Sequence, residues 1–178
     1  MRRLTGTLAL FTTLLLHGPA EGCGDKLLVL GRPLRFNSRP AVMLAFAPAG
    51  SFLASLLNDP GWSSAIAKGR HRLHIVQSPE QLAQDLNVER YDVILVDLAR
   101  AAALRSQLAV NPCTAVLAPV VDSASRDAVR TVEKDYGIAI KGTGKTSDYL
   151  FAIGRAVDLH ERKVEAAARE RKNLRKNS

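Results

Sequence analysis

The sequence contains few of the residues from which metal centres are built. Among its 178 residues there are two cysteines, Cys23 and Cys113, and four histidines. No pair of these residues has the short spacing of a zinc ligand set, so no metal site is predicted. The histidines also form no Ser-His-Asp or Cys-His pattern with their neighbours. We therefore predict a protein without an obvious catalytic set, and not an enzyme.

Long apolar runs are also missing. The run Leu8–Leu16 is too short to cross a bilayer comfortably, because a spanning helix needs about 20 residues. It follows Arg2 and Arg3 and precedes a Gly-Pro-Ala stretch that ends at Ala20, which together are typical of a bacterial signal peptide. We predict an export signal over residues 1–20. A membrane-anchoring or core helix is the alternative.

Cys23 lies just after this signal. Bacterial lipoproteins are cleaved before a cysteine that becomes lipidated, and residues 20–23 resemble that motif, although Ala20 replaces the usual Leu and Glu21 is atypical. Cleavage after Ala20 would instead leave Cys23 as a thiol, which could pair with Cys113 in an oxidising compartment. The sequence leaves lipidation, a disulfide and a free thiol open. In each case we expect an exported protein, either periplasmic or attached to the membrane through Cys23.

The middle of the chain lacks an excess of either charge, because its positive and negative side chains are nearly equal in number. The net charge is +8, but residues 161–178 hold seven Lys/Arg against three Glu, and Arg2 and Arg3 add two more positive charges. The high isoelectric point therefore reflects the two ends and not a basic binding face. For an exported protein with this distribution, we expect no nucleic-acid partner.

Strands and helices alternate over residues 41–160. Five strands are predicted: four at 42–46, 72–76, 91–98 and 137–141, and one that starts with residues 114–118. Helices are predicted at 51–68 with a break near Asp59, at 78–90 with Ser78 as N-cap and Gln81 completing a capping box, at 99–110, at 123–136 under Ser123 or Ser125, and from Thr146 or Ser147 onward. This order predicts an α/β fold with a five-stranded, doubly wound parallel sheet of the flavodoxin-like kind. Residues 21–40 form an N-terminal arm, and 161–178 a basic helical tail that frays at its end.

Residues 41–160 resemble the receiver domain of bacterial two-component response regulators. Asp97 follows the apolar run Val93–Val96, where that family has its phosphate-accepting Asp, and Lys141 ends the fifth strand, where the family has an invariant Lys. Open α/β sheets place their ligands at these carboxyl ends of the strands. The resemblance implies a receiver-like fold with a protein-binding surface over roughly residues 123–160.

The sequence departs from the receiver family at the site itself. The acidic pair that holds Mg²⁺ after the first strand is missing, because residues 46–50 are Phe-Ala-Pro-Ala-Gly. Pro119 or a neighbour replaces the Ser/Thr that ends the fourth strand, and Gly142 replaces the Pro after Lys141. Phosphoryl transfer needs the cation, and a lone carboxylate holds Mg²⁺ poorly. We predict a degenerate pseudo-receiver, in which Asp97 caps the following helix or pairs with Lys141.

Residues 139–146 match a relaxed P-loop pattern that ends in Gly144, Lys145 and Thr146. Ala139 stands in place of the first glycine, and the segment follows the last strand instead of opening the domain. A simple turn between the last strand and the last helix is the favoured interpretation, so no cofactor is predicted.

The sequence therefore favours an exported, non-catalytic module that binds a protein partner and is lipid-anchored if Cys23 is modified. The alternative is a phosphoacceptor or nucleotide-dependent signalling enzyme that uses Asp97, Lys141 and Lys145.

Overall fold

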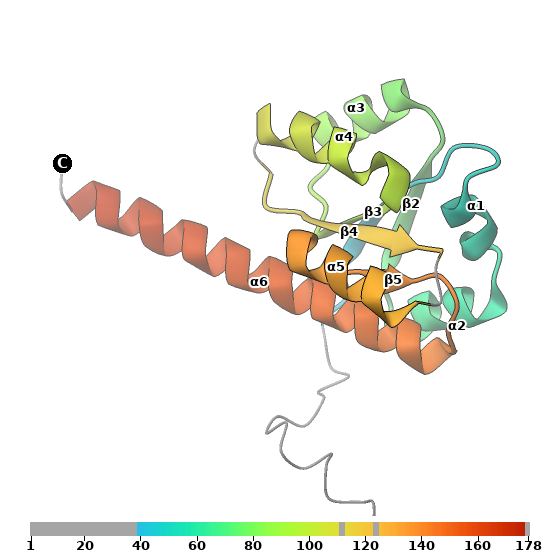
Figure 1. Cartoon of the computed structure of the whole chain (residues 1–178). Coiled ribbons are helices and arrows are strands. Elements are labelled where there is room, and N and C mark those ends of the chain that lie inside the picture. Colours follow the sequence, from blue (N-terminus) through green and yellow to red (C-terminus); the bar gives the residue numbers. More distant parts are fainter. Residues whose placement is uncertain (1–38, 111–112, 123–124, 177–178) are drawn as a thin grey trace, which may run out of the picture. The chain divides into compact units, whose positions relative to one another are not determined.

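The structure is a computed structural model that describes residues 39–110, 113–122 and 125–176 (Figure 1). The signal at residues 1–20, nearly all of the arm and Cys23 lie outside the described residues. Export, lipidation and the Cys23–Cys113 disulfide therefore stay predictions. Within the described residues, no helix is both long enough and apolar enough to cross a bilayer.

Five parallel strands form one sheet, in the order β2-β1-β3-β4-β5 (Figure 1). The strands are β1 (Val42–Phe46), β2 (Arg72–Val76), β3 (Val93–Asp97), β4 (Val116–Val121) and β5 (Ile140–Lys141). This order is that of flavodoxin-like sheets, which place a topological switch point between β1 and β3. The predicted α/β fold with a five-stranded parallel sheet is confirmed.

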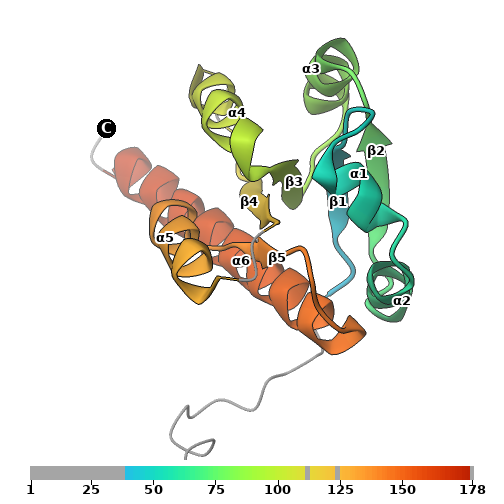
Figure 2. The same cartoon turned by 45° about the vertical axis from the view of Figure 1, so that its right-hand side comes forward.

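Helices cover both faces of this sheet (Figures 1 and 2). They are α1 (Phe52–Leu57), α2 (Pro60–Lys68), α3 (Pro79–Val88), α4 (Leu98–Val110), α5 (Arg126–Tyr136) and α6 (Thr146–Lys176). Alternate residues of a strand point to opposite faces, and β1 illustrates the result. Met43 and Ala45 pack with α1, α2 and α6, whereas Leu44 and Phe46 pack with α3 and α4. Val132 of α5 packs against Val121 at the end of β4.

Short polar side chains set the starts of four helices. The N-caps are Ser51, Asp59, Ser78 and Ser125. Each accepts a hydrogen bond from a backbone N–H in the first turn, which satisfies a donor that has no partner within the helix. Ser78 is thus confirmed as a cap. Gln81 departs from the predicted capping box, because its Oε1 accepts from the N–H of Gln77 at 3.1 Å and not from that of Ser78.

β5 is shorter than the sequence predicts, and Pro119 gives the physical reason. β4 runs on to Val121, so Pro119 lies inside the strand, opposite Val96 of β3. In a parallel sheet, successive residues bond alternately to the two neighbouring strands. The Val121 carbonyl accepts from the N–H of Gly142 on the β5 side at 2.9 Å, so Pro119, two positions earlier, faces β5 as well. Proline has no N–H to donate there, and β5 is only 2 residues long.

The last helix, α6, continues without a break over 31 residues, which is about 46 Å at 1.5 Å per residue. Tyr149, Ile153 and Val157 are buried against the sheet. From residue 161 onward most side chains are exposed, and the helix extends past the sheet (Figures 1 and 2). Helical geometry continues to Lys176, residues 177–178 lie outside the described residues, and fraying at the end of the chain stays a prediction.

The start of α6 also differs from the prediction. The helix begins at Thr146, so neither Thr146 nor Ser147 is its N-cap. Instead, Asp148 Oδ2 accepts a hydrogen bond from the Lys145 N–H at 2.9 Å. A carboxylate in the first turn of a helix also interacts favourably with the helix dipole.

Candidate functional site

Asp97 lies at the carboxyl edge of the sheet, as the last residue of β3. Its side chain is only 10% exposed, and both of its oxygens have partners. Oδ1 accepts from the Leu53 N–H of α1 at 2.8 Å, and Oδ2 lies 3.3 Å from Nη1 of Arg100 in the first turn of α4. The carboxylate therefore joins the starts of two helices to the end of β3.

These partners are not the ones predicted from the sequence. Lys141 is exposed at the end of β5, and among the ion pairs of the described residues none joins it to Asp97. Asp97 also bonds to the backbone of α1 and not to that of the helix that follows it. The physical reason is the loop after β1, which brings the first N–H groups of α1 to the end of β3.

The surroundings of Asp97 offer few ligands for a cation. Residues 46–50 contribute no carboxylate. In the part of the chain that the structure describes, no three His, Cys, Asp or Glu residues come together as a metal site would require. Mg²⁺ takes carboxylates and waters in an octahedron. Here it would find one carboxylate that already accepts hydrogen bonds from Leu53 and Arg100.

The turn between β5 and α6 does not have the form of a phosphate cradle. In a P-loop, backbone N–H groups at the start of a helix point at the phosphate. Here Asp148 accepts from the N–H of Lys145, so a negative charge lies where a phosphate would bind. The ring of Phe52 packs on Gly142 so closely that a Cβ at that glycine would overlap it. Residues 144–146 thus belong to a self-capped turn that disfavours anions.

Tyr149 closes the same turn from inside the core. Its hydroxyl donates to the Gly142 carbonyl at 3.3 Å, and burial raises the pKa of the phenol. Its ring meets Trp62 edge-on, with centroids 5.2 Å apart and an interplanar angle of 76°. Trp62 is 1% exposed, so it is a packed residue of the core.

A dense cluster of charges lies at the opposite, amino edge of the sheet. We define the amino-edge cluster as Arg39, Asp92, His160 and Glu161. Asp92 precedes β3, and its Oδ1 lies 2.8 Å from Arg39 Nη2 and 3.1 Å from His160 Nε2. Its Oδ2 accepts from the Val42 N–H at 2.8 Å. Burial alone would raise the pKa of Asp92, but the hydrogen bonds from Arg39 and Val42 outweigh it and lower the pKa.

His160 links this cluster to the last helix. It is 6% exposed, and its Nδ1 lies 3.0 Å from the carbonyl oxygen of Thr114, which can only accept a hydrogen bond. Its Nε2 faces the carboxylate of Asp92, which also accepts. The ring therefore lies between two hydrogen-bond acceptors. His160 thus joins α6 to the residues before β3 and β4, and Glu161, which accepts from Arg39 Nε at 3.0 Å, joins α6 to the residues before β1.

His71 is a second buried histidine at this edge. Its Nδ1 accepts a hydrogen bond from the Ala41 N–H at 3.1 Å, which requires that nitrogen to be unprotonated. Burial lowers the pKa of His71, although the nearby charge of Asp92 acts in the other direction. His71 therefore contributes to the fold as a neutral side chain.

Sequence reasoning missed the amino-edge cluster, although two signals were present. Asp92 immediately precedes the four apolar residues of β3, where a lone carboxylate is drawn into the edge of a buried sheet. His160 follows Val157 by three positions, which continues the inward-facing spacing of α6. A search for apolar periodicity alone does not identify either residue, because both are polar.

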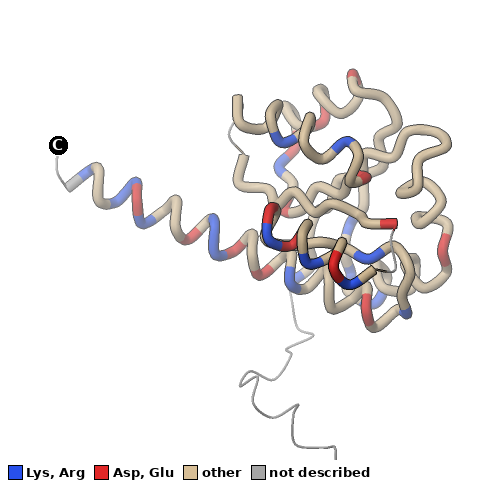
Figure 3. The backbone as a smooth tube through the Cα atoms, viewed as in Figure 1, with Lys and Arg blue, Asp and Glu red and all other residues tan. Residues whose placement is uncertain are grey.

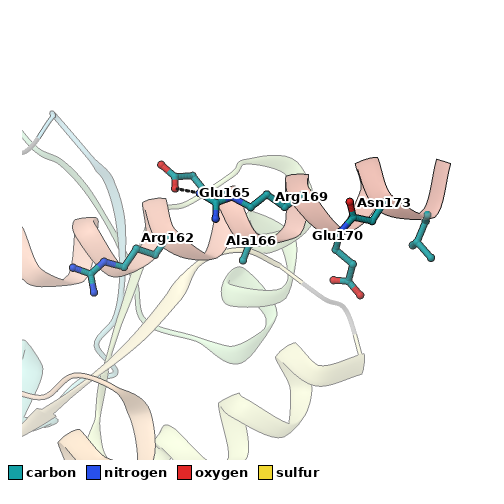
Figure 4. Close-up of a pocket in the computed structure, with 7 residues that line it drawn as sticks. Arg162, Glu165, Ala166, Arg169, Glu170 and Asn173 are labelled. Carbon is teal, nitrogen blue, oxygen red and sulfur yellow. Dashed lines mark ion pairs between the residues drawn. The ribbon is translucent and has the colours of Figure 1, made fainter. Parts of the chain in front are cut away.

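A shallow hollow runs along the exposed end of α6 (Figure 4). Its lining residues all belong to α6 and are Arg162, Glu165, Ala166, Arg169, Glu170, Asn173 and Leu174. Ligand sites usually enclose their ligand between several elements, so this surface does not have the form of a small-molecule site.

Cys113, the described member of the predicted cysteine pair, is exposed.

Comparison of the chain with protein-family models, with curated proteins and with solved structures finds no match.

Proposed function

We propose that the protein is an exported, non-catalytic module that uses a receiver-like fold to bind a protein partner. The observation that carries this proposal is the state of Asp97. Both of its oxygens accept hydrogen bonds from protein donors, and the loop after β1 supplies no second acid. A carboxylate used in this way contributes to packing and not to phosphoryl transfer.

The partner surface in this proposal spans α5, β5 and the first half of α6, roughly residues 123–160. Phe151 is 39% exposed on α6. The Arg155 guanidinium lies 6.0 Å from the centroid of its ring and 2.8 Å from Glu133 on α5. Aromatic residues and arginine are enriched in protein interfaces, and this ion pair holds the arginine beside the ring.

The same proposal includes export through residues 1–20, followed by a mature chain that begins at Glu21 or at lipidated Cys23. Mass spectrometry of the mature N-terminus, after cell fractionation, tests this part. An intact Met1 in the soluble cytoplasmic fraction would contradict it.

Site-specific photo-crosslinking tests the partner surface. A photoreactive residue at Phe151 of the full chain should give a discrete adduct with one protein in the native host, and Arg155→Glu should weaken that adduct. The matched control is Val88, which is 87% exposed on α3 at the other face of the sheet. Equal adducts at both positions, or none at Phe151, would reject the surface. An adduct lost in Asp97→Asn would instead support the phosphoacceptor alternative.

A further inference from the structure

The two ends of α6 differ in charge. We call residues 161–176, which extend past the sheet, the tail. The tail holds seven Lys/Arg and three Glu. Glu161 pairs with Arg39 at 3.0 Å, and Glu165 pairs with Arg169 at 3.6 Å. The other cations described with their side chains form no ion pair within the described chain, and they are Arg162, Lys163, Arg171, Lys172 and Arg175.

These cations surround the helix instead of lining one side. Successive residues of an α-helix are rotated by about 100°, so Arg171 lies roughly opposite Arg162. Figure 3 shows Lys and Arg along the whole extension of α6. A stereospecific protein groove reads one face of a helix, whereas a diffuse anionic surface attracts cations on any side that approaches it.

The tail has little apolar surface to insert into a bilayer. Its exposed large hydrophobic residues are Val164 and Leu174, and it contains no aromatic residue. Helices that embed in the headgroup region carry a broad apolar face. Any contact of the tail with a membrane would therefore be electrostatic and would remain at the surface.

The tail leaves the domain at the corner where the described chain begins. Arg39, the first described residue, contacts Glu161, the first residue of the tail. The predicted signal and Cys23 precede Arg39 in the sequence, so an N-terminal membrane attachment would be linked to the domain through the chain that enters at this corner. A single acyl chain anchors a protein only marginally, and a basic segment is a common second signal.

We propose that the tail binds the anionic headgroups of a lipid bilayer through these surface cations. This function is separate from the partner surface at residues 123–160. The electrostatic attraction of the tail to anionic lipid does not require export or lipidation. Its role in the cell rests on the membrane-proximal location that the proposed function includes.

The test compares binding of the full chain to vesicles of phosphatidylcholine alone and of phosphatidylcholine mixed with phosphatidylglycerol. Arg171→Gln, Lys172→Gln and Arg175→Gln are combined in one variant. We expect its partitioning to the anionic vesicles to fall about 100-fold, because each surface cation adds about 1 kcal/mol and 1.4 kcal/mol corresponds to tenfold. Comparison within the full chain cancels any contribution from the apolar run at residues 8–16.

The matched control removes three exposed cations from the body of the domain, through Lys68→Gln, Arg90→Gln and Arg126→Gln. It makes the same change in net charge and should retain most of the binding. High salt should abolish the difference between the tail variant and the wild type, because the Debye length falls to about 3 Å at 1 M.

Three results would overturn the proposal. These are an equal loss in the control variant, unchanged binding of the tail variant, and tighter binding to duplex DNA than to anionic vesicles at the same salt. None of them bears on the crosslinking at Phe151, so the two proposals fail separately.

Discussion

At the carboxyl edge of the sheet, Asp97 meets one backbone N–H and Arg100, whereas at the amino edge Asp92 meets Arg39, His160 and the N–H of Val42. Open α/β sheets ordinarily place their ligands at the carboxyl edge. Here that edge is closed by its own residues, with Phe52 packed on Gly142. The denser network lies at the other edge, where it joins helix to sheet. A fold therefore fixes where a site can form, but not that one does.

The largest expected effect is the loss of the amino-edge carboxylate. Asp92→Asn should lower the free energy of unfolding by about 3 kcal/mol, because it removes the carboxylate that Arg39, His160 and the Val42 N–H share and leaves Arg39 without this counter-charge. The matched substitution Asp97→Asn should cost about 1 kcal/mol, since an amide oxygen can still accept from the Leu53 N–H. Urea unfolding at neutral pH measures both. Equal losses would remove the distinction between the two edges.

The pH dependence of stability tests the neutral state of His71. Its pKa is lowered from 6.5 in the folded protein, so below that value the unfolded chain takes up the proton first. The contribution of His71 is therefore complete above about pH 6.5 and is lost as the pH falls, with a slope of at most about 1.4 kcal/mol per pH unit. His71→Asn, whose amide oxygen can accept from the Ala41 N–H, should flatten this slope in urea unfolding series. An unchanged slope would show that His71 does not cause it.

Removal of residues 165–178, which include all but the first four residues of the tail, should have a smaller effect on the stability of the fold. Deletion of residues 165–178 leaves the amino-edge cluster intact, and most of the side chains removed are exposed. The free energy of unfolding, followed through the melting temperature, should change by about 1 kcal/mol or less, as is usual for surface changes. A loss of several kcal/mol would indicate instead that the tail packs on the domain or joins two copies.

At the carboxyl edge we expect no chemistry at all. Acetyl phosphate with Mg²⁺ should leave Asp97 unmodified by intact-mass analysis, because residues 46–50 provide no carboxylates to hold the metal. A phosphoryl adduct on Asp97 that forms within minutes and disappears with chelator would restore the phosphoacceptor alternative.

Much of the fold could be predicted because it depends on local patterns. β1 and β2 begin and end at the residues predicted from the sequence, and Ser78 is the N-cap of α3. β5 was predicted too long, because the effect of Pro119 depends on which neighbouring strand its missing N–H faces. That information exists only once the strands are paired.

The polar contacts were harder to predict than the elements. The position of Asp97 at the end of β3 followed from the sequence, but its partner Leu53 lies 44 residues away. Arg39 and Asp92 are 53 residues apart, and His160 and Thr114 are 46 apart. Contacts of this kind depend on the sheet order and on how far the loops reach, neither of which hydrophobic periodicity encodes.

Pro119 also has a consequence for the aggregation of this chain during folding, because it lies next to one edge of the sheet. An unpaired strand edge is a template for aggregation, and proteins blunt such edges by keeping them short. β5, 2 residues long beside Pro119, is an edge of that kind. β2 is the other edge of the described sheet, with 5 residues and Ile75 51% exposed. Ile75→Lys should therefore slow the aggregation of the refolding chain, as measured by light scattering. The control Thr143→Lys, which places a lysine just beyond β5, should leave the aggregation rate unchanged.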